Sequence, residues 1–155
     1  MSEEQELTAQ FHKKFAVETF NYVWDLLNKT ERTIEEEDSM LHAAHASRFH
    51  WEKIGQPVNL ARGEWQVARV YTVLGRPKCG LYHARRCLEI CEQHQIGDFD
   101  LAYAYEALAR AYLADNKFIE YNYYLRLARQ AGEHIADADD KAHFFEDVES
   151  IAERD

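Results

Sequence analysis

A segment in the first third of the chain brings together side chains that could bind a metal ion or a small ligand. It contains His42, His45 and Trp51, and Asp38 lies one helical turn before it. At 100° per residue in a helix, Asp38, His42 and His45 lie within roughly 60° of one another. Two imidazoles and a carboxylate on one face are groups that zinc or iron accepts.

The same segment also has a structural interpretation. Two histidines spaced three apart, with no identifiable fourth ligand, match no metalloprotease motif. Histidines on a half-buried helix are commonly hydrogen-bonded core residues, and Arg48 and Trp51 are close in sequence. We therefore interpret His42 and His45 first as a polar cluster packed against the next helix, and second as a ligand site. No metal or other cofactor is assigned.

A second group of potential ligands is better explained by packing. His83, Cys87 and Cys91 share a helix face at a spacing of four. Zinc sites commonly use Cys-x-x-Cys pairs in loops, which this pattern is not. Cysteine often packs as a small apolar side chain, so Cys87 and Cys91 are predicted to lie in the core.

The chain carries no recognisable catalytic motif. It has only six glycines and no glycine cluster that could cradle a phosphate, and no nucleophile lies on a strand-to-helix elbow. We predict a protein without enzymatic activity and assign no catalytic residue.

These residues are positioned by a sequence that repeats itself. Val67-Ala-Arg-Val-Tyr71 is echoed by Leu108-Ala-Arg-Ala-Tyr112, and the two tyrosines lie 41 residues apart. A fixed period in this range is typical of stacked helical hairpins.

Apolar residues at spacings of three and four predict seven helices joined by short turns, and no strand. Ser2 with Gln5 and Thr33 with Glu36 form expected capping boxes, and Asp98 is an expected N-cap. The chain is predicted to be one all-α domain, an α-α superhelix of stacked antiparallel hairpins. Its parts are an N-terminal hairpin (1–56), two repeated hairpins (58–134) and a capping helix (137–155). The individual helices are expected at about 3–28, 33–54, 59–74, 77–95, 99–114 and 117–133, followed by the last helix.

Composition restricts the partners. The chain has 155 residues, 46% of them hydrophobic, and a formal charge of −10, which argues against a nucleic-acid partner. No stretch approaches the ~20 apolar residues that cross a bilayer, so no membrane association is expected. The acidic N-terminal segment does not resemble a secretory signal, and three cysteines make no disulfide framework. We expect a cytoplasmic protein.

The repeat resembles the tetratricopeptide family, whose usual period is 34 residues. The longer spacing of 41 residues resembles the variant with longer helices found in kinesin light chains. The resemblance covers about residues 58–134. Small residues at Ala68 and Ala109 would let helices approach closely, and Tyr71 and Tyr112 would fill the space beside them. The matching positions are Val67, Ala68, Tyr71, Gly75, Gly80, Ala84 and Cys87 in the first copy, and Leu108, Ala109, Tyr112, Asn116, Tyr121, Leu125 and Ala128 in the second.

The resemblance implies that the first helix of each hairpin lines a concave groove in which a peptide binds. Arg69 and Arg110 occupy equivalent positions and should stand side by side, an arrangement that favours capture of a carboxylate. The leading hypothesis is therefore a non-enzymatic protein-protein interaction module that binds an acidic peptide or chain terminus. The implied groove residues are Arg62, Trp65, Arg69, Thr72, Tyr103, Glu106, Arg110 and Leu113.

Other interpretations remain open. Arg69 and Arg110 could instead pair with Glu64 and Glu106 and only stabilise the stack. A different class of function is a small-ligand or metal-binding protein centred on His42, His45, Trp51 and Trp65. A third is a self-assembling scaffold that associates into a homo-oligomer through the first helix or through Tyr121, Tyr123 and Tyr124.

Overall fold

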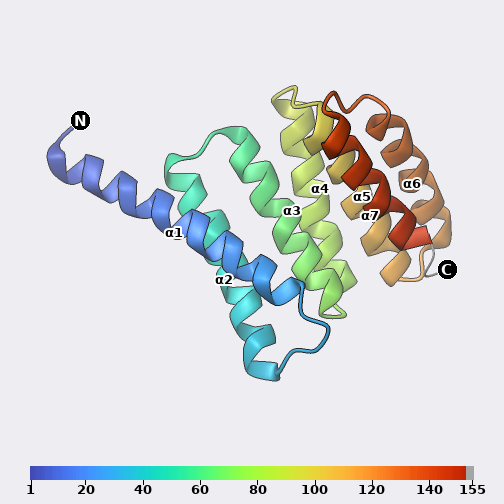
Figure 1. Cartoon of the computed structure of the whole chain (residues 1–155), viewed down its shortest axis with the longest axis horizontal. Helices are drawn as coiled ribbons and strands as arrows, with labels where there is room; N and C mark the ends of the chain where they lie inside the picture. Colours follow the sequence, from blue (N-terminus) through green and yellow to red (C-terminus); the bar gives the residue numbers. More distant parts are fainter. Residues whose placement is uncertain (153–155) are drawn as a thin grey trace.

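The computed structural model describes residues 1–152, which form seven α-helices and contain no strand (Figure 1). This confirms the predicted all-α class. None of the seven helices is both long enough and apolar enough to cross a bilayer. The predicted capping segment 137–155 ends in residues outside the described range. The helices are α1 (Glu3–Leu27), α2 (Ile34–Ile54), α3 (Pro57–Val73), α4 (Pro77–Gln93), α5 (Asp98–Ala114), α6 (Phe118–Gly132) and α7 (Ala138–Ala152).

The helix starts follow local sequence signals with two differences. The capping boxes at Ser2 and Thr33 form as predicted. Helix α3 begins at Pro57, two residues before the expected start, because proline suits the first helical position. The N-cap prediction for Asp98 is wrong, since Gly97 occupies that position. The Asp98 carboxylate instead accepts a hydrogen bond from the Ala136 backbone N–H, at 3.3 Å, and so ties the start of α5 to the segment before α7.

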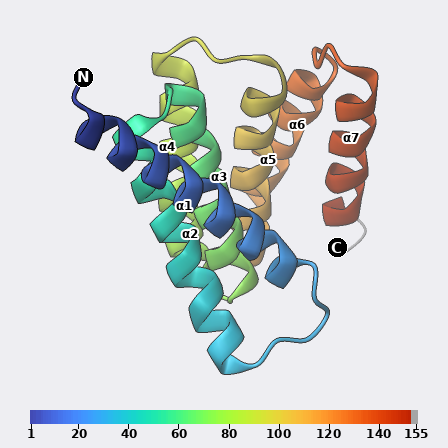
Figure 2. The same cartoon turned by 60° about the vertical axis from the view of Figure 1, so that its left-hand side comes forward.

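Consecutive helices pack as the pairs α1/α2, α3/α4 and α5/α6, and α7 packs on α5 and α6. The odd-numbered helices also contact one another, from α1 to α3, α3 to α5 and α5 to α7. Helices α2 and α3 also pack together, as do α4 and α5. Within residues 1–152, the backbones of α2 and α4, and of α4 and α6, do not approach within 8 Å, although the His45 and His83 rings of α2 and α4 lie 5.5 Å apart. We refer to the four odd-numbered helices as the odd-numbered layer; the even-numbered helices pack beside it (Figures 1 and 2).

Small residues make this close packing possible. Ala68 on α3 and Ala109 on α5, the equivalent residues of the repeat, are both buried. On α4, a Cβ atom added at Gly80 would lie 3.1 Å from the Ala68 carbonyl oxygen, so the backbones of α3 and α4 approach too closely for a larger residue. The repeat thus marks the helix contacts that set the spacing of the odd-numbered layer.

Candidate functional site

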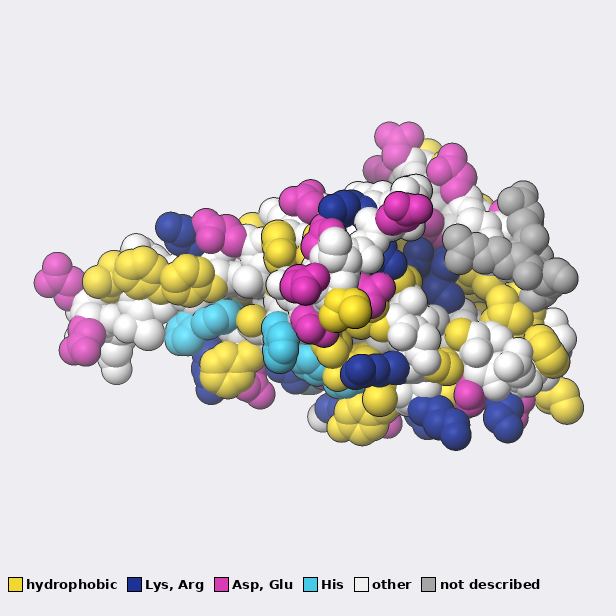
Figure 3. Space-filling model, turned by 90° about the horizontal axis from the view of Figure 1, so that it is seen from below, with side chains coloured by type: hydrophobic (Ala, Val, Ile, Leu, Met, Phe, Trp, Pro, Cys, Tyr) yellow, Lys and Arg dark blue, Asp and Glu magenta, His cyan; other side chains and the backbone are white. Residues whose placement is uncertain are grey.

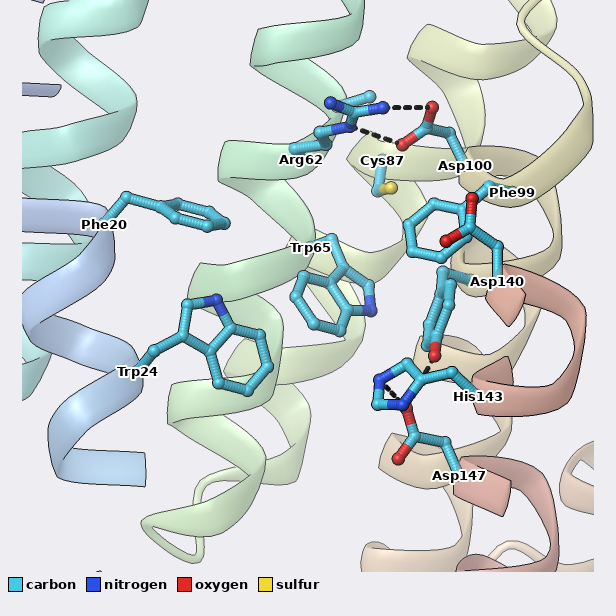
Figure 4. A pocket seen from close by; sticks show the side chains of 12 residues that line it. Phe20, Trp24, Arg62, Trp65, Cys87, Phe99, Asp100, Asp140, His143 and Asp147 are labelled. Carbon is cyan, nitrogen blue, oxygen red and sulfur yellow. Dashed lines mark hydrogen bonds and ion pairs between the residues drawn. The ribbon is translucent and has the colours of Figure 1, made fainter. Parts of the chain in front are cut away.

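The odd-numbered layer contains a pocket of about 430 Å³ (Figure 4). Helices α1, α3, α5 and α7 each contribute side chains to it, together with Cys87 from α4. The lining residues are Phe20, Trp24, Ala61, Arg62, Trp65, Cys87, Phe99, Asp100, Tyr103, Asp140, His143 and Asp147.

Aromatic rings form one wall of the pocket and link three helices. Trp65 lies at the centre of the wall, with ring centroids 5.4 Å from Trp24 on α1 and 5.5 Å from Tyr103 on α5. Phe99 adds a fourth ring, 4.6 Å from Tyr103. The indole N–H of Trp65 has no hydrogen-bond partner among the described residues, although it is buried. The pocket therefore offers a broad apolar surface and one unused donor.

The opposite side of the pocket is charged. Arg62 makes two hydrogen bonds to Asp100, at 2.8 and 3.1 Å, and this pairing raises the pKa of its guanidinium group. The Tyr103 hydroxyl donates to Asp147 at 2.6 Å. Burial and the neighbouring Asp147 charge raise the pKa of Tyr103 far above its usual range, so the phenol stays protonated as the donor. Asp140 forms no ion pair within the described chain.

The two repeat-equivalent arginines lie next to one another, but a carboxylate of the chain contacts both. Arg110 binds the Glu106 Oε1 atom at 2.6 Å, and Arg69 lies 3.6 Å from the same oxygen. Glu106 is 0% exposed. The single Glu106 carboxylate offsets one of the two arginine charges, which weakens the sequence-based reason for an acidic ligand and leaves the prediction open. This agrees with the alternative interpretation for Glu106; Glu64 instead contacts Arg48 and His83.

The predicted groove residues thus divide among three places. Arg62, Trp65 and Tyr103 line the pocket, as a groove predicts. Arg69 and Glu106 lie below its surface in the ion-pair cluster. Arg110 belongs to that cluster and also borders a separate hollow, which Thr72 and Leu113 line as well.

The histidine segment joins three helices and lies outside the pocket. His45 on α2 shares a hydrogen bond of 2.8 Å with the Tyr71 hydroxyl on α3. Tyr71 stacks on His83 of α4, and His83 contacts Glu64 at 2.6 Å. His42 is exposed. This geometry agrees with a polar packing cluster.

The structure separates the aromatic residues that the ligand hypothesis grouped with the histidines. Trp65 lines the pocket, whose lining includes neither His42, His45 nor Trp51. No group of three His, Cys, Asp or Glu side chains in residues 1–152 is arranged to hold a metal ion. The proposed histidine-centred ligand site therefore lacks both a metal-binding geometry and its expected aromatic wall.

Sequence reasoning missed the residues that α1 and α7 contribute. Phe20 and Trp24 fit the apolar spacing of the first helix, and Asp140 belongs to an acidic run with Asp137 and Asp139 at the start of α7, so neither pattern by itself indicates a binding site. Their common signal is helical periodicity, since Asp140, His143 and Asp147 are spaced three and four apart and share one face of α7. Neither helix carries the repeat signature, so only their packing against α3 and α5 reveals the site.

The chain matches no family model, no curated protein and no solved structure. The site is accordingly defined by its own geometry.

The histidine cluster predicts a pH-dependent stability. Burial and the nearby His83 charge lower the pKa of His45, with His42 adding to the effect and Glu64 opposing it. The unfolded chain therefore binds this proton more readily, and folding loses stability as the pH falls below about 6.5. We expect the free energy of unfolding, measured with urea, to fall less between pH 7.5 and pH 5.5 in His45→Gln than in the wild type.

The exposed His94 at the end of α4 supplies the control. His94→Gln should retain the wild-type difference between the two pH values. An unaltered pH difference in His45→Gln would contradict the prediction.

The ion-pair cluster around Glu106 predicts that a nearly isosteric substitution will strongly lower the free energy of unfolding. Glu106→Gln removes the buried negative charge that Arg69 and Arg110 share and places a neutral amide beside the two half-buried guanidinium groups. Breaking a buried pair in this way costs about 3 kcal/mol of unfolding free energy. The matched control is Glu149→Gln on α7, whose exposed pair with Arg129 should contribute less than about 1 kcal/mol. Equal urea midpoints for the two variants would show that the cluster does not stabilise the stack.

Proposed function

We propose that the chain is a non-enzymatic interaction module, built as a tetratricopeptide-like stack, that binds a peptide segment of another protein in the pocket of the odd-numbered helices. The architecture is supported by the 41-residue repeat and by backbone contacts between successive odd-numbered helices, whereas the backbones of α2, α4 and α6 stay apart in the described residues. A stack with this asymmetry curves toward its closely packed layer, so the pocket lies on the inner face.

The pocket itself carries the proposal. Its central residues, Trp65, Trp24 and Tyr103, are the types that most often dominate binding energy at protein interfaces. They come from three different helices, so an extended segment crossing the layer would meet each in turn.

The cysteines favour binding over covalent chemistry. Cys87 is the cysteine that lines the pocket, and its hydrogen bond to Cys91 together with burial raises its pKa, so it remains a neutral thiol. Cys79, Cys87 and Cys91 are all free, which supports a cytoplasmic location as part of the proposal.

Peptide display tests this function. A random peptide library selected on the purified protein should yield sequences that bind the wild type. Trp65→Ala should weaken them by about 30-fold, because a central aromatic anchor contributes roughly 2 kcal/mol or more. Tyr82→Ala, which removes an exposed ring of α4 that does not line the pocket, is the control and should bind normally. Failure to select any peptide, or selected peptides indifferent to Trp65→Ala, would reject the pocket as a peptide site.

A second candidate function is self-association through α1. Leu7, Phe11 and Phe15 are 52%, 47% and 42% exposed, and their four-residue spacing places them in one row. Figure 3 shows this apolar ridge on the projecting end of the molecule. Lys14 lies about two turns from Glu6 on the same helix, so two antiparallel copies of α1 would bring opposite charges together. A second copy of this chain is the occupant that such a pattern favours.

Sedimentation velocity tests the second candidate. The wild type should sediment faster as its concentration rises through the micromolar range. The double variant Phe11→Ser, Phe15→Ser should remain monomeric, because it removes two exposed rings that contribute little to the monomer's own core. A wild type that is monomeric at every concentration would dismiss self-association and leave the peptide-binding proposal unaffected.

A further inference from the structure

The pocket has an excess of carboxylates over cations. Asp100, Asp140 and Asp147 line it, against a single arginine, Arg62. Asp100 takes both hydrogen bonds from that guanidinium group, which leaves the carboxylates of Asp140 and Asp147 on the wall formed by α7. His143, exposed between them on the same helix, lies 3.5 Å from Asp147.

These two carboxylates lie across the pocket from the tryptophans. Figure 4 shows Asp140 and Asp147 on one side, and Trp24 and Trp65 on the other. An aromatic face attracts a cation through its quadrupole, and a carboxylate attracts it directly. A single cationic group lying between the two walls would be attracted both by the tryptophan rings and by the carboxylates.

We propose that the pocket binds a lysine or arginine side chain of a basic peptide segment, with the aliphatic stem along Trp65 and the charged group at Asp140 and Asp147. This inference rests on the proposed function and specifies its partner. The long apolar stem of either side chain suits the aromatic wall, and its charged end suits the carboxylates.

An acidic anchor would lack a counterpart in the same pocket. Arg62 is held by Asp100, and Arg69 and Arg110 are held by the buried Glu106. A carboxylate entering the pocket would lie beside Asp140 and Asp147 and would be repelled by both. The formal charge of −10 adds a long-range attraction for basic segments, which steers them toward the protein and weakens with salt.

Three fluorescein-labelled peptides of equal length test the charge preference. Each alternates leucine with one other residue, which is lysine, glutamine or glutamate. By fluorescence anisotropy at low salt, the lysine peptide should bind at least about 10-fold more tightly than the glutamine peptide, with the glutamate peptide weakest. The advantage of the lysine peptide should shrink as salt is added.

Two variants test whether Asp140 and Asp147 cause the preference for the lysine peptide. The double variant Asp140→Asn, Asp147→Asn should bring the lysine peptide to the affinity of the glutamine peptide, while retaining an acceptor for the Tyr103 hydroxyl. Glu149→Gln removes one negative charge from α7 outside the pocket and should keep most of the preference. Circular dichroism and the urea midpoint establish that each variant is folded.

The outcomes separate this inference from the proposed function. Glutamine or glutamate peptides that bind as tightly as the lysine peptide, and lose binding in Trp65→Ala, would overturn the basic anchor but keep the peptide site. A lysine preference unchanged by the double variant would also overturn it. Nα-acetyl-lysine amide that competes as well as the whole peptide would replace the peptide with a small amine as ligand. The absence of any selected peptide from display would reject the proposed function itself.

Discussion

Glu106 is the group on which the arrangement of the inner layer depends. Its carboxylate is fully buried on α5 and contacts Arg69 of α3 and Arg110 of α5, while Arg110 also reaches the backbone carbonyl of Asp147 on α7 at 3.4 Å. A buried charge is tolerated only when it is paired, so each partner must keep its position for the others to remain stable. The cluster therefore connects three of the four helices that surround the pocket and restricts how far they can slide.

Packing of small residues supplies the complementary constraint. Ala68 of α3 packs against Ala107 and Ala111 of α5, whereas its repeat equivalent Ala109 packs against Tyr121 of α6 and Ile151 of α7. Trp65 packs at the junction of several apolar clusters, yet one face of the aromatic wall borders the pocket. The pocket therefore borders this close packing, because Trp65 packs against the cluster that contains Ala68 and also lines the pocket.

The proposed function combines these two features. A rigid layer holds the tryptophans and the α7 carboxylates at fixed positions, so an incoming side chain loses freedom while the site does not. The arginines, which attract attention in the sequence, serve the inner layer instead of the ligand. Because Glu106 holds both arginines while Asp140 and Asp147 line the pocket, the proposed ligand is basic instead of acidic.

The sequence by itself determined the seven helices, the capping boxes at Ser2 and Thr33, and the residues that bring α3 and α5 together, because helix formation and amphipathic burial depend on neighbours within a few positions. It also placed Trp65 and Tyr103 on the groove side through the repeat. Only the tertiary structure decided that Trp24 and Asp147 complete the pocket and that Glu106 contacts both arginines. Those outcomes depend on how helices far apart in the chain cross and which side chains then meet, and the spacing within any one helix carries no information about either.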